Sequence, residues 1–287
     1  MGAIFRHELR NYFHSLTAYV FGAFLLAVVG LGSVLYNLQA AVSNFEFVLS
    51  FASIIFVVIV PILTMRTMAE ERRQRTDQLL YSLPITTTQV VLGKYLALLV
   101  VYLIPLAVIS LYPLLFSQFG DVYLPTSYGS LFAFFMMGAA LLAVGMFLSS
   151  LTDNQGFAAG IGIAAILLNY YSVSLAEYTS STAMGSLIAL YVIALLLGVV
   201  IRGLTRNENL AYGVTLVLIA ALSVAYFVNS SAFEGLLPDI MTKLSLFRQF
   251  NSFVNGAFDL TAIVYYVSVM GFFLFLSVQS MEKRRYN

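Results

Sequence analysis

Long apolar stretches recur along this chain of 287 residues, and they constrain its fold more than any other feature. An α-helix needs about 20 residues to cross the roughly 30 Å hydrocarbon core of a bilayer, where its backbone groups must be hydrogen-bonded within the helix. Hydrophobic residues make up 61% of the sequence and charged residues 9%. Soluble domains contain only about 45–50% apolar residues. We therefore expect an all-α integral membrane protein.

Eight stretches are long and apolar enough to be membrane-spanning helices. They lie at residues 17–36, 47–65, 95–117, 128–151, 155–174, 183–201, 210–228 and 261–280. Within these bounds none carries Asp, Glu, Lys, Arg or His, whereas ion-coupled carriers usually keep such residues inside the bilayer. The sequence therefore argues against a carrier, and only weakly against a passive channel. The remaining segments are too short for a soluble domain, so we expect one membrane domain over 1–287.

The basic residues predict how the chain is oriented, because Lys and Arg collect in cytoplasmic loops. In the eight-span arrangement two basic residues, Lys243 and Arg248, lie on one side. The opposite side holds Arg6, Arg10, Arg66, Arg72, Arg73, Arg75, Lys94, Arg202, Arg206, Lys283, Arg284 and Arg285. We therefore expect both termini in the cytoplasm.

Residues 1–16 predict an amphipathic helix at the membrane surface. Its apolar face carries Phe5, Leu9, Tyr12, Phe13 and Leu16, and its polar face carries Arg6, His7, Arg10, Asn11 and His14. The two histidines have no acid or thiol at ligand spacing, so no metal site is expected. The chain has no Cys, no HExxH, no GxSxG and no P-loop, since "VVLGKY" supplies a Gly-Lys pair alone. We expect no catalytic residue, no cofactor bound by this chain and no nucleic-acid partner.

The densest charges lie in "MAEERRQRTDQLLYSLP", residues 68–84, within the predicted cytoplasmic loop 66–94. Read as a helix, Glu70 precedes Arg73 by three residues and Glu71 precedes Arg75 by four, which is the favourable order. Three leucines and a proline close the segment, at Leu79, Leu80, Leu83 and Pro84. Thr86 is the expected N-cap of the next helix with Gln89 as its partner, and Lys94 is expected to snorkel to the headgroups. The alternative is a solvated, positive-inside loop.

This loop resembles the coupling loop of ABC type-2 export permeases. The resemblance rests on Arg66, on "AEER" at 69–72, on Thr76 and on the leucines, Pro84 and Gly93-Lys94, and it is closest to the gliding-motility-associated, GldF-like branch. The starting "MGAIFRHELRNYFHSLTAYVF" and the later "QFNSFVNGAFDLTAIVYYVSV" resemble the ends of that family. The family core has six spans, so residues 183–228 are interpreted as an additional helix pair, unless the alignment of the middle differs.

The resemblance implies the permease subunit of an ABC exporter in the inner membrane of a prokaryote. ATP and Mg²⁺ would then bind a separate ATP-binding cassette subunit, and the permease would work as a homodimer or a related heterodimer, with an extracytoplasmic accessory subunit as a further partner. The loop would form a cytoplasmic coupling helix, and this helix would be the interface with the ATP-binding subunit. Its polar contacts would be Glu70, Glu71, Arg72, Arg73 and Thr76, and its docking residues Leu79, Leu80, Leu83 and Pro84. A passive channel, a carrier and a scaffold subunit remain alternatives.

The expected translocation path is less sharply marked. Asn169, Tyr170 and Tyr171 are candidates for an outer gate, with an interfacial aromatic belt as the alternative. The segment 229–260 is amphipathic and would lie on the outer leaflet or dip into the pathway. Prolines at 61, 105 and 113 predict kinks in spans two and three. Glycine pairs at 138 and 145 and at 156 and 160 would allow close helix approach.

Overall fold

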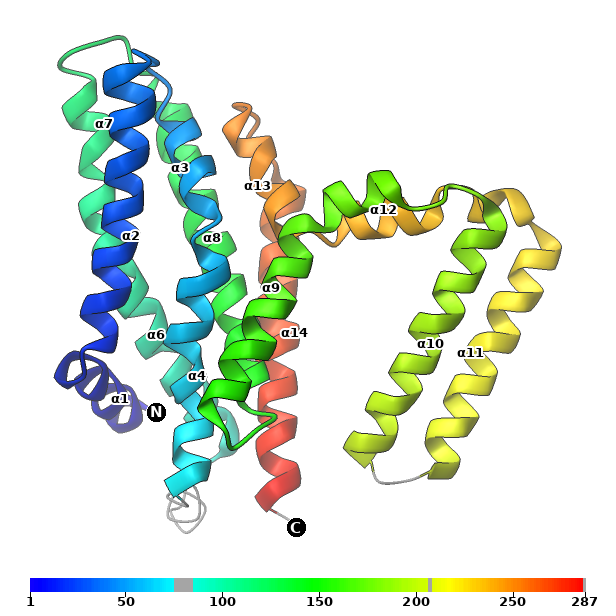
Figure 1. The fold of residues 1–287 in the computed structure, drawn as a ribbon. Coiled ribbons are helices and arrows are strands. Elements are labelled where there is room, and N and C mark those ends of the chain that lie inside the picture. Colours follow the sequence, from blue (N-terminus) through cyan, green and yellow to red (C-terminus); the bar gives the residue numbers. More distant parts are fainter. Residues whose placement is uncertain (75–84, 206–207, 286–287) are drawn as a thin grey trace. The chain divides into compact units, whose positions relative to one another are not determined.

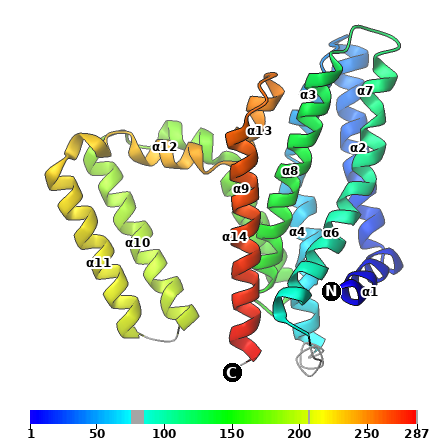
Figure 2. The same ribbon diagram turned by 180° about the vertical axis from the view of Figure 1, so that it is seen from behind.

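The computed structural model describes residues 1–74, 85–205 and 208–285, and every regular element within them is helical. The chain divides into two compact units, residues 1–170 with 246–287 and residues 171–245. Figures 1 and 2 show the ribbon from opposite sides. The lack of strands in the described ranges confirms the prediction of an all-α fold.

The first unit contains most of the apolar helices. Its elements are α1 (Gly2–His14), α2 (Thr17–Ser33) with its π-helical continuation η1 (Val34–Gln39), α3 (Phe45–Ser53), α4 (Phe56–Gln74), α6 (Thr87–Ile109), α7 (Leu111–Phe116), α8 (Leu124–Ser149), the greater part of α9 (Gln155–Tyr178), α13 (Leu246–Val254) and α14 (Leu260–Arg285). The start of α1 and the ends of α4 and α14 lie at the same end of this unit (Figures 1 and 2).

Helix α8 is the centre of the first unit and packs against α3, α4, α6, α13 and α14. Small residues let its neighbours approach. Gly138 lies under the ring of Tyr102 from α6 and Gly145 under Thr64 from α4, so closely that an added Cβ would overlap either side chain. The close approach predicted for this glycine pair is confirmed. Around Gly160 of the second pair there is nothing within 4 Å of an added Cβ.

Six helical segments in the described ranges are long and apolar enough to cross a membrane. They are Thr17–Gln39, Thr87–Phe116, Leu124–Ser149, Gln155–Tyr178, Ala211–Val228 and Leu260–Lys283. The pair formed by α3 and α4 makes a seventh span if its two helices are counted as one. The protein is therefore a multi-pass membrane protein. The predicted span at 183–201 falls on α10, which counts only as a shorter apolar helix, Ala183–Val199, among the described residues, so the total of eight stays a prediction.

The second predicted span is bent by 57° between α3 and α4, ahead of Pro61 rather than at it. The amides of Val57 and Val58 bond to the carbonyls of Ile54 and Ile55, three residues back, so the turn before the proline is tighter than an α-helix. A proline ring clashes with the carbonyl four residues earlier, which is that of Val57. The break at residues 54 and 55 thus lies almost two turns before the proline that predicted a kink.

Helix α13 comes from the segment predicted to be amphipathic, and it is held at both ends. Its apolar side, including Phe247, Phe250 and Phe253, is buried against α3, α8 and α14. At its start, the amide of Leu246 donates to Asn169 Oδ1 (3.0 Å) and the carbonyl of Leu246 accepts from the Tyr266 hydroxyl (2.8 Å). At its other end the hydroxyl of Ser130 in α8 donates to the carbonyl of Phe253 (2.9 Å). In this unit the phenylalanines form part of the protein core.

The second unit consists of the last residues of α9 and a helical hairpin. Its elements are α10 (Ala183–Thr205), α11 (Glu208–Val228), the 3₁₀-helix η2 (Ser230–Phe233) and α12 (Leu236–Lys243). Gly198 of α10 lies against Thr215 of α11, and the hydroxyls of Tyr191 and Ser223 join the same helices at 2.7 Å. Most apolar side chains of α11 are exposed, as expected of a lipid-facing surface.

Candidate functional site

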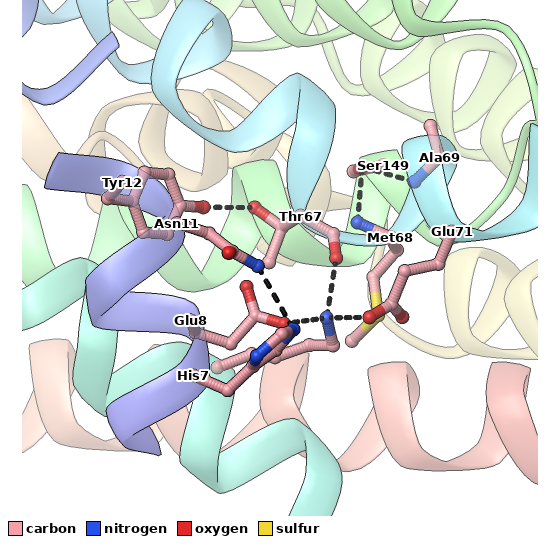
Figure 3. Close-up of polar contacts among 10 residues, drawn as sticks. His7, Glu8, Asn11, Tyr12, Thr67, Met68, Ala69, Glu71 and Ser149 are labelled. Atoms are coloured by element: carbon pink, nitrogen blue, oxygen red, sulfur yellow. Dashed lines mark hydrogen bonds and ion pairs between the residues drawn. The ribbon is translucent and has the colours of Figure 1, made fainter. Parts of the chain in front are cut away.

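Lys94 lies in the second turn of α6, and its ammonium group is the centre of a buried polar cluster (Figure 3). The residue is 1% exposed. Its Nζ donates to Glu8 Oε1 of α1 at 2.7 Å, to Glu71 Oε1 of α4 at 2.6 Å and to the carbonyl of Thr67 in α4 at 3.1 Å. These four residues are called the Lys94 cluster below. All three donors of the ammonium are used.

Local sequence explains why Lys94 reaches this position. The side chain of Thr86 accepts a hydrogen bond from the amide of Gln89 (3.3 Å) and so starts α6, which confirms the predicted N-cap. Gly93 precedes the lysine, and an added Cβ there would lie 3.1 Å from Ile4 Cγ2 of α1. The glycine therefore lets α1 lie directly on α6, which brings Glu8 to the lysine.

The charges of the Lys94 cluster do not cancel. The ammonium faces two carboxylates, with the side chains of Glu8 and Glu71 11% and 23% exposed. Buried charges are costly unless they are paired and hydrogen-bonded, so the lysine stabilises both carboxylates. Beside the cluster, the Tyr12 hydroxyl contacts Thr67 Oγ1 at 3.2 Å, and burial raises the pKa of this phenol. The tyrosine is therefore a neutral partner for Thr67 at physiological pH.

A second set of contacts joins the end of α4 to α8 and α14. Ser149 Oγ accepts from the amides of Met68 and Ala69 (3.3 and 3.2 Å) and donates to the carbonyl of Met65 (3.0 Å). Arg72 is 8% exposed and donates to Ser280 Oγ of α14 at 3.4 Å. The final turns of α4 are thus bonded to α1, α6, α8 and α14.

A pocket of about 690 Å³ opens between α1 and the end of α4. Glu8, Glu71 and Lys94 of the Lys94 cluster reach its wall. Further along, the pocket is lined by side chains of both charge signs, including Arg66 and Glu70. No group of three or more His, Cys, Asp or Glu side chains that could hold a metal ion occurs among the residues that the structure describes.

The predicted coupling residues fall partly inside the described ranges. Glu71 belongs to the Lys94 cluster, and Arg72 contacts α14. Glu70 accepts from Gln74 Nε2 at 3.3 Å and lines the pocket, and Arg73 is exposed. The other predicted coupling residues lie outside the described residues: Thr76, Leu79, Leu80, Leu83 and Pro84.

One expectation about a charged residue is wrong. Lys94 does not snorkel to the headgroups, because Glu8 and Glu71 hold its ammonium inside the protein. The predicted spans at 47–65 and 95–117 begin directly after Glu46 and Lys94. The helices start earlier, α3 at Phe45 and α6 at Thr87. Both charged residues are therefore helical, and each is 1% exposed. A hydropathy pattern places the end of a predicted span at a charged residue, whereas tertiary packing can bury a charged residue near a helix end.

Glu8, Tyr12, Thr67, Ser149 and Ser280 were not predicted as site residues. Glu8 carried a usable signal, because it lies next to Leu9 and one turn before Tyr12, on the apolar side of α1. An acid on that side needs a buried cation. The polar face of α1 was predicted correctly, since all five of its residues are exposed. The helix packs along α6, and its position at the membrane surface stays a prediction.

Two of the three candidate gate residues hold the start of α13. Asn169 accepts from the amide of Leu246, and the ring of Tyr170 meets that of Phe247 edge-on at 4.9 Å. Tyr171 is 45% exposed. These contacts give Asn169 and Tyr170 a structural role. A gating role for the three residues stays a prediction.

Comparison with known proteins places this arrangement in a family. The model of the ABC-2 family transporter proteins matches residues 31–176, which include α3, α4, α6, α8 and most of α9. No curated protein and no solved structure matches the chain significantly. The matched residues are half of the sequence and contain the end of α4 and the lysine that secures it. The chain belongs to the ABC-2 family of transporter proteins, as a multi-pass membrane permease.

Proposed function

We propose that this chain is the permease subunit of an ABC exporter, driven by ATP hydrolysis on a separate cassette subunit that docks on the loop after α4. Family membership supports the permease role, and the resemblance to export permeases supports the outward direction. The proposal includes a dimer, cytoplasmic termini and an inner-membrane location. Residues 70–84 form its docking site, and an outer gate near Asn169 completes the path.

The observation that carries this proposal is how firmly the end of α4 is attached. Four other helices bond to residues 65–72, immediately before the loop. A helix end attached in this way moves with its neighbours as a rigid body, whereas a loosely packed end absorbs a push locally. A force applied to the loop would therefore reach α1, α6, α8 and α14 together. A solvated loop without a partner requires no such attachment.

The first test is purification of the tagged protein in mild detergent, followed by identification of co-purifying proteins and measurement of ATP hydrolysis. We expect a stoichiometric P-loop ATPase. Replacing Glu70 and Arg73 by Gln should weaken its retention, because both side chains precede the loop and neither belongs to the Lys94 cluster. The matched control is Lys243→Gln in α12, an exposed position in the other unit.

A second variant tests transmission separately from docking. Ser149→Ala removes the hydroxyl that bonds α8 to α4, so the ATPase should still bind while transport per ATP hydrolysed falls. An unchanged ratio would contradict rigid-body transmission through this contact. If no ATPase co-purifies under conditions that preserve other membrane complexes, the exporter proposal itself is lost, and the channel and scaffold alternatives take its place.

A further inference from the structure

Glu46 is a buried acid that has no cation beside it. It lies in the first turn of α3, a helix near the end of the first unit that is away from the chain termini (Figures 1 and 2). The residue is 1% exposed, and its Oε2 is buried without a hydrogen-bond partner in the described part of the chain. The groups that act on its carboxyl are its own backbone amide and the hydroxyl of Ser127 in α8. Glu8 and Glu71, by contrast, both pair with Lys94.

The helices around α3 do not supply a charge that compensates Glu46. Helix α3 packs against α2, η1, α8 and α13, and the ring of Phe45 meets two rings of α7. The titratable side chains on these five elements are Tyr19, Tyr36, Tyr112, Tyr128 and Arg248. Arg248 is exposed and does not act on the Glu46 carboxyl. A carboxylate enclosed in this way is costly, and uptake of a proton removes its charge.

Helix α3 is attached less firmly than the end of α4. Among the described residues, the contact of Glu46 with Ser127 is its one polar contact with another helix. Its other contacts are apolar and involve the fully buried side chains of Phe45, Val48, Leu49 and Ala52. The helix has nine residues and ends at the 57° break before α4. It is therefore a short segment with a hinge at one end and an ionisable group at the other.

We propose that Glu46 is a proton-binding site that holds α3 against α8. The carboxyl carries its proton while α3 is packed on α8, because its charge would otherwise be buried without a partner. When the proton leaves, α3 tilts about residues 54 and 55 and brings the carboxylate into contact with water. A metal ion needs several ligands, and no group of three or more acidic, histidine or cysteine side chains that could hold one occurs in the described ranges. The inference does not depend on the export direction or on the ATPase.

Low pH should favour the closed arrangement, in which α3 lies on α8. The closed state binds the proton more tightly than the open state, in which the carboxyl is hydrated, so opening releases one proton. The ratio of closed to open molecules should therefore fall about tenfold for each pH unit, over the range in which only the closed state keeps the proton. A neutral side chain at position 46 should remove this dependence.

The test is the distance between spin labels on α3 and α8, measured by double electron–electron resonance on the purified full-length chain in detergent. The chain has no cysteine, so Phe47→Cys and Phe132→Cys, both at exposed positions, define the two labelled sites. Between about pH 5 and about pH 9 we expect the ratio of closed to open molecules to fall at least about tenfold. Adding Glu46→Gln leaves no proton to lose, and this variant should stay closed at both pH values.

Controls separate the alternatives. Asp121→Asn changes an exposed acid in the loop before α8 and should follow the wild type. Glu46→Leu is also neutral and should stay closed, which keeps the test valid if the glutamine variant does not fold. Equal distances at both pH values in the wild type overturn the proposal, and so does a pH response that persists in both neutral variants. If sodium ions restore the closed population at the higher pH, the ligand is a metal cation and the assignment of a proton is wrong.

Discussion

Replacing Lys94 by Met should destabilise the first unit strongly, although Met fills nearly the same volume. The lysine is 1% exposed and makes three hydrogen bonds, two of them to carboxylates. Removing one partner of a buried ion pair costs about 3–5 kcal/mol, because the remaining charge loses its compensation. Glu71 is 23% exposed and regains some hydration, so we expect the lower end of this range, about 3 kcal/mol.

The measurement is the free energy of unfolding of the purified protein in mixed micelles, from titration with a denaturing detergent. Lys243→Met is the matched control, because its amine pairs with Asp239 at 2.7 Å while 69% exposed. Such exposed pairs contribute about 0–1 kcal/mol, so this variant should unfold almost like the wild type.

A triple variant tests whether charge is the cause. Adding Glu8→Gln and Glu71→Gln to Lys94→Met removes the two carboxylate charges that the lysine pairs with, so most of the lost stability should return. The three changes should be non-additive by about 2 kcal/mol or more, since the residues share one network. If Lys94→Met unfolds like Lys243→Met, or if the triple variant is less stable than Lys94→Met alone, the cluster does not stabilise the fold as argued.

Two other predictions concern packing and helix capping. Gly138→Ala should lower the free energy of unfolding by about 1–3 kcal/mol, because the added Cβ would overlap Tyr102. Gly160→Ala should be neutral or stabilising, because nothing lies within 4 Å of its added Cβ. Equal effects of the two variants would contradict the close packing of α6 and α8. Thr86→Ala should lower the free energy of unfolding by about 1 kcal/mol, because the cap on α6 is lost. Thr86→Ser keeps a capping hydroxyl and should unfold like the wild type. If Thr86→Ser loses as much stability as Thr86→Ala, the residue has a role other than capping.

Local features of the fold could be predicted from the sequence because their causes are local. The N-cap at Thr86 and the polar face of α1 depend on spacing within a few residues, and both are as predicted. The bend in the second predicted span lies almost two turns before Pro61, the residue that predicted it. The count of spans was less certain, because α10 has a shorter apolar part in the described residues and α3 with α4 form a bent pair.

The candidate site depends on residues that are far apart in the chain. Lys94 contacts Glu8, 86 positions earlier, and Ser149 bonds to an amide 81 positions earlier. No periodicity connects such positions. A lysine at the end of an apolar stretch can either reach the headgroups or pair with buried acids, and its own neighbourhood favours neither outcome.

By itself, the sequence determined that this chain is an all-α membrane protein, because length and hydropathy decide whether a helix can cross a bilayer. It also located the segment with the densest charges, within residues 68–84. Tertiary structure alone decided which helix packs on which, and therefore where the buried charges find partners. Glu8 reaches Lys94 because Gly93 lets α1 lie on α6, and Glu71 reaches it from α4; both contacts exist only in the folded protein.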